Sequence, residues 1–352
     1  MIPRGLDATA ANLILVSDKV RQVVAGQIPL PEVVELFLTN YCNFACPFCR
    51  CAKYHGDTRQ FMDFDTLARL LEELVGQGVR RIELGGGGEP LEHPMIRQVL
   101  ERFREQGFRF GLITNGWRLT EFPELVDSII ECADWVRFSL DGLTDDVYRV
   151  VHGRPNIAYQ PLRAAIAELV RRARARDGVG WAPKVGIKLI LQRPNRHQLL
   201  AAVDEALDLG VNYLQFKWLE NHPWSIPPEE RPGLSEALHA RLQQLRDGSL
   251  IVDVLPGYEA REVRERCIMS VLHPLIDWDG TIYFCAFFHH RKETHSIGNI
   301  TTQRFFDCWN SEYHRDRRRL VDPAQCVANC PMLRYNPIMK FIVEEGFRFH
   351  YI

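Results

Sequence analysis

Three cysteines within eight residues, Cys42, Cys46 and Cys49, are the part of this chain whose residue types and spacing point most directly to chemistry. They follow an apolar run, residues 33–39, that predicts a buried strand. Three thiolates from one loop can ligate three irons of a 4Fe–4S cluster and leave the fourth iron without a protein ligand. Because an open iron can bind a substrate or a cofactor, the spacing indicates catalysis rather than electron storage. A zinc loop that takes its fourth ligand from elsewhere is the alternative.

The composition of the chain argues against several classes of protein. Its 352 residues suffice for one large barrel, or for a barrel with a small domain, and the formal net charge of −2 gives no support to a nucleic-acid partner. No stretch approaches the ~20 apolar residues of a membrane span, and no apolar segment of a secretory signal follows Met1. We therefore expect a cytoplasmic protein with neither a nucleic-acid partner nor a membrane partner.

The ten cysteines gather near the two ends of the chain. In a cytoplasmic protein such groups are more often metal ligands than disulfides. The first group contains Cys51 beside the three cysteines of the loop. The second group consists of Cys267, Cys285, Cys308, Cys326 and Cys330. Cys132 stands alone between the groups, and we expect it to be structural.

Segments with strand and helix patterns alternate after the cysteine loop. The predicted strands are residues 33–39, 81–84, 109–113, 135–140, 184–191 and 213–218. The predicted helices are residues 63–78, 94–106, 123–132, 161–176 and 195–209. Such alternation requires parallel strands with helices outside, and six units are too few for the closed eight-stranded barrel. We predict an α/β fold built on a partial (β/α)6 TIM-like barrel.

Changes in composition along the chain suggest the domain boundaries. We expect an N-terminal extension over 1–30 and the barrel over 31–220. A proline-rich stretch begins the next part, so we assign 221–260 to a linker and a helix. Residues 261–352, with short strands and five cysteines, form a small C-terminal α+β domain.

Polar motifs follow the second, third and fourth predicted strands. Four glycines, 85–88, precede Glu89. The glycines let the backbone approach a ligand closely, and Glu89 supplies a fixed anion. Asn115 follows the third strand, and Ser139 and Asp141 end the fourth. Active sites of such folds lie at the carboxyl ends of the strands, where all these residues fall. Each motif alone is equally well explained as ordinary turn chemistry.

Together the motifs resemble the radical S-adenosylmethionine (SAM) superfamily. The resemblance rests on Cys-x3-Cys-x2-Cys after the first strand, with Phe48 before the last cysteine, and on Gly-Gly-Glu-Pro after the second, and it covers about residues 33–218. It implies a SAM-binding 4Fe–4S cluster, with the backbone of Phe48 near the adenine. The motif positions that it assigns are Cys42, Cys46 and Cys49 for the cluster, Gly87, Gly88 and Glu89 for the methionine amino group, and Ser139, Asp141 and Asn115 for the ribose. Cys51 has no place in the pattern.

The C-terminal cysteines resemble the opening of the SPASM/Twitch accessory domains. Gly280 stands between Cys267 and Cys285 and permits the hairpin turn that the pattern needs. The resemblance implies a second, fully ligated 4Fe–4S cluster on Cys267, Cys285, Cys326 and Cys330, and zinc on these cysteines is the alternative. Cys308 is left over; it is a buried structural thiol, a hydrogen-atom donor or an atypical ligand.

A fully ligated second cluster has no site for substrate, so electron transfer is its natural role. The Cys-x17-Cys spacing is similar to that of 2-deoxy-scyllo-inosamine dehydrogenases of aminoglycoside antibiotic biosynthesis. The resemblance implies that a 5′-deoxyadenosyl radical abstracts hydrogen from a carbinol C–H of an amino sugar or aminocyclitol, and that the alcohol becomes a ketone. A flavodoxin- or ferredoxin-type protein would donate the first electron. Lys217, Glu220 and His222, after the sixth strand, are candidate bases for the carbinol proton.

Two other reactions fit the same domains. A radical epimerase of a carbohydrate or peptide would return a hydrogen atom from a thiol, with Cys308 as the candidate donor. An enzyme that matures ribosomally made peptides usually carries a leader-binding domain before its barrel. The thirty residues before the barrel are too few for such a domain, which counts modestly against that reaction.

Overall fold

The structure is a computed structural model that describes residues 16–52, 58–176, 181–245, 250–255, 267–285, 291–322, 324, 326, 332 and 335–344. The chain divides into two compact units. One, here the terminal unit, comprises residues 1–35, 65–81 and 258–352; the other, here the barrel unit, comprises residues 36–64 and 82–257. No helix of the described residues is both long and apolar enough to cross a bilayer.

Parallel strands form the core of the barrel unit. Their order is β2 (Arg81–Gly85), β3 (Arg109–Thr114), β4 (Ala133–Ser139), β5 (Lys184–Leu191), β6 (Tyr213–Trp218) and β7 (Ile251–Leu255), and β1 (Val34–Phe37) lies beside β2. Strands β3 to β7 pair in parallel. The arrangement confirms the predicted partial barrel of the α/β class. Strand β7 differs from the prediction, which placed these residues in a linker region: Ile251 and Val254 are exposed, so the apolar signal of a buried strand is weak there.

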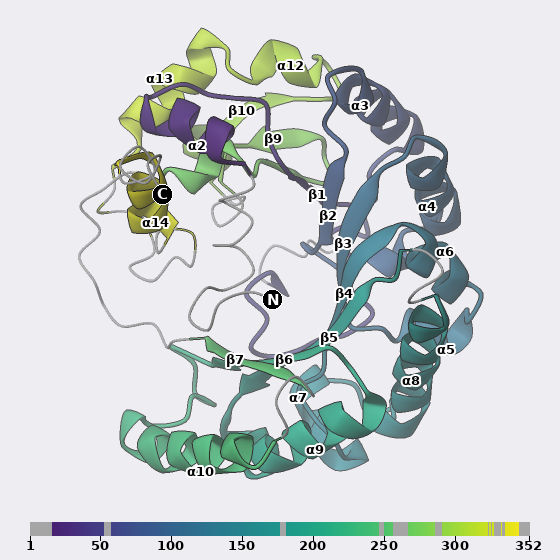
Figure 1. Ribbon diagram of the computed structural model, residues 1–352. Coiled ribbons are helices and arrows are strands. Elements are labelled where there is room, and N and C mark those ends of the chain that lie inside the picture. Colours follow the sequence, from purple (N-terminus) through teal and green to yellow (C-terminus); the bar gives the residue numbers. More distant parts are fainter. Residues whose placement is uncertain are drawn as a thin grey trace. The chain divides into compact units, whose positions relative to one another are not determined.

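Helices cover the outer face of these strands (Figure 1). They are α4 (Ile96–Glu105), α5 (Arg118–Glu121), α6 (Leu125–Cys132), α7 (Asp145–His152), α8 (Tyr159–Ala175), α9 (Leu199–Leu209) and α10 (Arg231–Gln243), with short 3-10 turns at Pro90–Glu92, Arg193–Gln198 and Pro228–Glu230. Helix α9 ends as predicted at Gly210, whose φ of 69° is left-handed. Helix α7 was not predicted, because its eight residues give only two turns of periodicity.

Side chains alternate between two environments along β4, β5 and β6. Residues facing the helices, such as Phe138, Leu189 and Phe216, are fully buried and apolar. The alternate residues, which we call the inner face, are half-buried and largely polar, and they include Arg137 and Lys188. This pattern follows from the two-residue period of a strand. The barrel unit therefore has an apolar layer outside its strands and a charged layer inside.

The terminal unit is an antiparallel sheet with short helices. Strands β8 (Leu275–Ile276), β9 (Thr281–Tyr283) and β10 (Ser296–Asn299) pair in that order. The helices are α2 (Ser17–Val24), α3 (Phe64–Gly76), α11 (Lys292–His295), α12 (Phe305–Cys308), α13 (Glu312–Leu320) and α14 (Asn336–Glu344), with a 3-10 turn at Met269–Val271. The predicted hairpin turn is present: Gly280 has φ of 80°, and its N–H donates to the carbonyl of Asp277 at 2.8 Å.

Candidate active site

The cysteine loop begins a few residues after β1. Cys42, Cys46 and Cys49 are all half-buried, and the loop turns where the N–H of Cys49 donates to the carbonyl of Cys46 at 3.0 Å. Burial raises the pKa of the Cys42 thiol to about 12, and the nearby Glu89 adds to the rise. Burial likewise raises the pKa of Cys46, with Asp141 next in effect. Because such thiols ionise only beside a strong positive charge, the site suits a metal cluster that holds them as thiolates.

The glycines after β2 lie against the backbone of the cysteine loop. The N–H of Gly88 donates to the carbonyl of Thr39 at 2.8 Å, and the N–H of Glu89 donates to that of Tyr41 at 2.8 Å. A Cβ on Gly88 would lie 2.0 Å from the Tyr41 carbonyl oxygen. The close approach that the glycines predict is therefore, at Gly88, an approach to the chain's own backbone. It fixes the cysteine loop against the end of β2.

Glu89 is buried, with 3% of its surface exposed. Its carboxylate accepts hydrogen bonds from Thr114 Oγ1 at 2.6 Å, from the N–H of Asn115 at 2.8 Å and from the N–H of Leu91 at 3.1 Å. Burial raises the pKa of Glu89 to about 7, and these hydrogen bonds oppose the rise. The side chain is thus an oriented anion that joins the ends of β2 and β3.

Asn115 lies beside the cysteine loop. Its Nδ2 donates to Asn43 Oδ1 at 2.7 Å and lies 3.8 Å from Cys42 Sγ. The buried Nδ2 of Asn43 has no hydrogen-bond partner among the described residues. Unsatisfied buried donors of this kind are uncommon in folded proteins, and here the donor is next to a cysteine of the loop.

Asp141 follows β4 by two residues and is also buried. Its Oδ1 accepts the N–H of Ile190 in β5 at 2.6 Å, and burial raises the pKa of its carboxyl to about 7. Ser139, two residues earlier, is half-buried on the inner face, where Lys188 is its partner in register on β5. Phe48 is half-buried within the cysteine loop. The structure therefore brings the ends of β1 to β4 to one place, as the motifs predicted.

Helix α7 contributes a contact that the sequence analysis missed. Nδ1 of His152 lies 3.2 Å from Cys46 Sγ. His152 is fully buried, which lowers the pKa of the imidazole to about 3, so the ring is neutral. The signals that could have located this helix are Thr144 before two acidic residues and the left-handed Gly153 after the last turn.

The inner face of the barrel unit carries three cations on neighbouring strands: Arg137 on β4, Lys188 on β5 and Lys217 on β6. Arg137 Nη1 reaches Gln215 Oε1 at 3.4 Å. Lys188 has no hydrogen bond or ion pair within the part of the chain that the structure describes. Burial, followed by Arg137 and Lys217, lowers the pKa of its ammonium to about 7, and the carboxylates of Asp141 and Glu83 oppose the fall. Of these three cations, only Lys217 was predicted from the sequence. The two-residue alternation along β4 and β5 could have indicated Arg137 and Lys188.

Glu220 and His222 are engaged in the loop that follows β6. Glu220 receives two hydrogen bonds from the guanidinium of Arg231, at 2.7 and 2.9 Å. His222 Nδ1 accepts the N–H of Trp224 at 3.1 Å. Of the three bases named from the sequence, Lys217 therefore lies on the inner face, whereas the other two hold the loop together.

The C-terminal cysteines belong to the terminal unit. Cys267, Cys285 and Cys326 are half-buried, and Cys330 lies outside the described residues. Cys308 is buried, and a Cβ on Gly298 would lie 2.3 Å from its sulfur, so this thiol packs tightly against backbone. The packing favours the structural role among those considered for Cys308.

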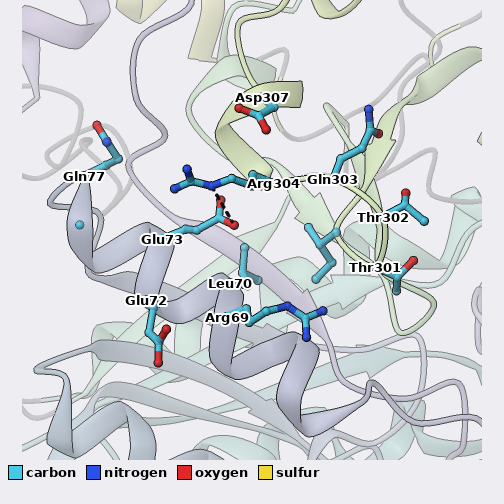
Figure 2. Close-up of a pocket in the computed structure, with 12 residues that line it drawn as sticks. Arg69, Leu70, Glu72, Glu73, Gln77, Thr301, Thr302, Gln303, Arg304 and Asp307 are labelled. Carbon is cyan, nitrogen blue, oxygen red and sulfur yellow. Dashed lines mark ion pairs between the residues drawn. The ribbon is translucent and has the colours of Figure 1, made fainter.

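The terminal unit also contains a hollow of about 800 Å³ between α3 and residues 300–307 (Figure 2). Glu73 crosses it, accepting the N–H of Phe305 at 2.9 Å and pairing with Arg304 at 3.6 Å. Residues of both charges line the hollow, among them Arg69, Glu72 and Asp307, and no cysteine does.

Comparison with protein-family models identifies two regions of the chain. Residues 36–187 match the radical SAM superfamily, and residues 267–331 match SPASM, an iron–sulfur cluster-binding domain. The first region contains the cysteine loop and the ends of β2 to β4. The second contains Cys267, Cys285, Cys326 and Cys330.

Curated proteins similar to the chain align with most of its length. A tungsten-containing aldehyde ferredoxin oxidoreductase cofactor-modifying protein of Pyrococcus furiosus is 25% identical, over 79% of this chain and 80% of that protein. A PqqA peptide cyclase of Ruegeria pomeroyi is 26% identical, over 80% of this chain and 72% of the cyclase.

Solved structures share the fold. Streptococcus suis SuiB bound to its precursor peptide SuiA has a TM-score of 0.66 at 16% identity, covering 91% of this chain and 74% of that one. The protein anSMEcpe with bound SAM and a peptide has a TM-score of 0.60 at 14% identity, covering 82% of each chain.

Proposed function

We propose that this chain, which belongs to the radical SAM superfamily and carries a C-terminal SPASM domain, is an enzyme that modifies a peptide. The observation that carries the peptide assignment is the similarity to PqqA peptide cyclases. It extends over 80% of the chain and therefore spans both domains rather than the barrel alone. A peptide substrate replaces the amino sugar as the favoured substrate class.

The radical SAM domain carries a 4Fe–4S cluster with SAM, and the SPASM domain carries additional iron–sulfur clusters. The residues present fit these groups. Three half-buried thiols stand on one loop, the buried Nδ2 of Asn43 beside them has no partner among the described residues, and Glu89 provides an oriented anion. When bound, the cluster and SAM supply the 5′-deoxyadenosyl radical that abstracts hydrogen from an unactivated C–H bond.

The proposal gives the residues of the site distinct roles. Cys42, Cys46 and Cys49 hold the cluster, and Glu89, with the backbone of Gly87 and Gly88, holds the methionine amino group. Ser139 and Asp141 hold the ribose, Phe48 borders the adenine, and Asn115 supports the cysteine loop. In the SPASM domain Cys267, Cys285, Cys326 and Cys330 hold a second cluster. An electron donor of the flavodoxin or ferredoxin type supplies the first electron.

The inner face suggests which peptides the enzyme accepts. Lys188 forms no hydrogen bond or ion pair among the described residues, although the carboxylates of Asp141 and Glu83 act on its pKa, and two further cations lie on the adjacent strands. An acidic side chain of a substrate would form an ion pair with the buried ammonium of Lys188 and would offset part of its desolvation cost. We therefore propose a peptide whose reacting segment contains Asp or Glu.

Substrate screening with the reconstituted enzyme tests the proposal. Under anaerobic conditions with reductant and SAM, we would incubate synthetic peptides with Glu, the same peptides with Gln, and a panel of aminocyclitols. The expected result is formation of 5′-deoxyadenosine above the substrate-free rate only with Glu peptides, together with a mass change in the peptide. Turnover of aminocyclitols alone would overturn the peptide assignment, and the Cys42→Ala/Cys46→Ala/Cys49→Ala variant provides the background.

Oxidation of an amino sugar or aminocyclitol alcohol to a ketone is the second candidate. The Cys267-x17-Cys285 spacing favours it, because a single fully ligated cluster can accept the electron that such a substrate releases. The two candidates differ in the class of substrate, so the substrate screen separates them. The packing of Cys308 against Gly298 does not favour the radical epimerase, which needs an accessible thiol.

A further inference from the structure

His152 is the one imidazole of the described residues in contact with a cysteine of the loop. Its Nδ1 lies 3.2 Å from Cys46 Sγ, within the distance of an N–H···S hydrogen bond. The other ring nitrogen, Nε2, is buried and has no hydrogen-bond partner among the described residues. Among the described residues, Cys46 is therefore the one hydrogen-bond partner of the imidazole.

The position of the ring is fixed from three sides. The carbonyl of His152 accepts the N–H of Ala45 at 3.1 Å, which ties the end of α7 to the cysteine loop. Gly153 adopts a left-handed φ of 62°, and a Cβ there would lie 2.2 Å from the Ala45 carbonyl oxygen. The rings of Phe44 and Tyr148 lie 4.9 and 4.4 Å from the imidazole centroid. Such a ring cannot turn away from the sulfur without disturbing its neighbours.

The surroundings also select the tautomer. A metal-bound thiolate can only accept a hydrogen bond, so the contact requires the proton on Nδ1. The other tautomer would bury an N–H on Nε2 without an acceptor among the described residues, which costs free energy. Both considerations place an N–H on Nδ1, directed toward Cys46.

We propose that His152 is a positioning residue of the radical SAM site, which donates an Nδ1–H hydrogen bond to the Cys46 thiolate and thereby raises the reduction potential of the cluster. The inference rests on the proposed assignment of Cys46 as a cluster ligand. A hydrogen bond to a ligand sulfur stabilises the more negative, reduced state, so its loss makes the cluster harder to reduce. The effect would set how readily the electron donor can start the reaction.

Potentiometric titration monitored by electron paramagnetic resonance tests the proposal on the reconstituted full-length enzyme. The signal that changes on addition of SAM identifies the relevant cluster. His152→Phe keeps an aromatic ring between Phe44 and Tyr148 but removes the donor. At a fixed ambient potential we expect about a tenfold lower ratio of reduced to oxidised cluster, which corresponds to about 59 mV.

Two further variants control this result. His152→Asn places an amide N–H near the position of Nδ1, and we expect it to restore most of the wild-type midpoint. His93→Phe removes another buried imidazole, one that contacts the carbonyl of Met62 at 2.8 Å instead of a sulfur, and should leave the midpoint unchanged. A wild-type midpoint in His152→Phe at full iron content would overturn the proposal.

A measurement on the unsubstituted protein covers the case in which His152→Phe assembles no cluster. Enzyme labelled with ¹⁵N-histidine should show a nitrogen hyperfine coupling in the SAM-responsive signal. Absence of the coupling overturns the hydrogen bond to Cys46. Absence of any SAM-responsive signal in wild type overturns the proposed function itself, which separates the two failures.

Discussion

The two units hold their cysteines in different ways. In the barrel unit three cysteines lie within eight residues, on a loop that is tied by backbone hydrogen bonds to the ends of neighbouring elements. In the terminal unit the matching cysteines are spread from 267 to 330, and the described elements between them include strands of two to four residues and α-helices of four to nine residues. We therefore expect the first site to be organised by the fold and the second to depend on bound metal to bring its ligands together. The comparison suggests that loss of iron has different consequences in the two units.

Removal of the cysteines gives the largest expected effect. Wild-type protein reconstituted anaerobically should hold about eight irons per chain, because each 4Fe–4S cluster contains four. The triple variant Cys42→Ala/Cys46→Ala/Cys49→Ala should keep about four, lose all SAM cleavage and retain the hydrogen-exchange protection of β5. Cys267→Ala/Cys285→Ala should also keep about four irons but lose the protection of β8 and β9.

Iron analysis and hydrogen exchange followed by mass spectrometry provide both readouts. Equal loss of protection in both units, or in neither, would contradict the difference proposed between them. Four irons in wild type that fall to none in the triple variant would mean that the C-terminal cysteines bind zinc or no metal.

Two buried aspartates allow a matched test of electrostatics. Burial raises the pKa of Asp141 in the barrel unit to about 7 and that of Asp277 in the terminal unit to about 8. A carboxyl with a raised pKa binds more protons when folded, so it makes the protein less stable as the pH rises from the unfolded pKa through the folded one. Relative to wild type, Asp141→Asn should therefore gain up to about 4 kcal/mol of unfolding free energy between pH 4 and pH 8.

Urea unfolding of the metal-free proteins at several pH values measures this gain. Asp277→Asn should show a similar dependence on pH, because its carboxyl is buried in the same way. Only Asp141→Asn should weaken SAM binding by the reconstituted enzyme. A flat difference across this pH range for both variants would show that neither carboxyl has a raised pKa.

The glycines provide a smaller contrast. Gly88→Ala would force a Cβ against the Tyr41 carbonyl at 2.0 Å, and neither backbone can move freely, so we expect a loss of about 1–3 kcal/mol and weaker SAM binding. Gly76→Ala in α3 meets no atom within 4 Å and should stabilise the protein by about 0.4–1 kcal/mol. Thermal unfolding of both variants measures the contrast, and a tolerated Gly88→Ala would refute the tight contact.

The smallest effect is expected in the hollow of the terminal unit. Glu73 accepts the N–H of Phe305, while its pairing with the exposed Arg304 is a surface ion pair worth little. Glu73→Ala, which removes the acceptor, should therefore cost about 1 kcal/mol, and Arg304→Ala should cost less. Equal costs in thermal unfolding would mean that the ion pair, and not the hydrogen bond, holds this segment to α3.

Much of the fold and part of the site could be predicted from local patterns. The strands at 184–191 and 213–218 are where periodicity placed them, and the radical SAM and SPASM assignments followed from cysteine spacing and short motifs. Helix α7 and strand β7 were not predicted from the sequence, because each is short and has a weak hydrophobic pattern. The glycines were predicted to let backbone approach a ligand closely. The group that Gly88 approaches, the carbonyl of Tyr41, is distant in sequence, so it could not be predicted from the local pattern.

The spacing of cysteines within one loop, the two-residue period of a strand and the glycine of a turn are all local properties of the sequence. These local properties were sufficient to identify the cluster, the cofactor and the barrel. Which groups meet across the fold depends on the pairing of strands and on helix packing. That pairing places Lys188 between Arg137 and Lys217, and helix packing places His152 on Cys46. Pairs separated by tens of residues or more leave no periodic signal in a single sequence, because their contact arises only once the strands have paired and the helices have packed.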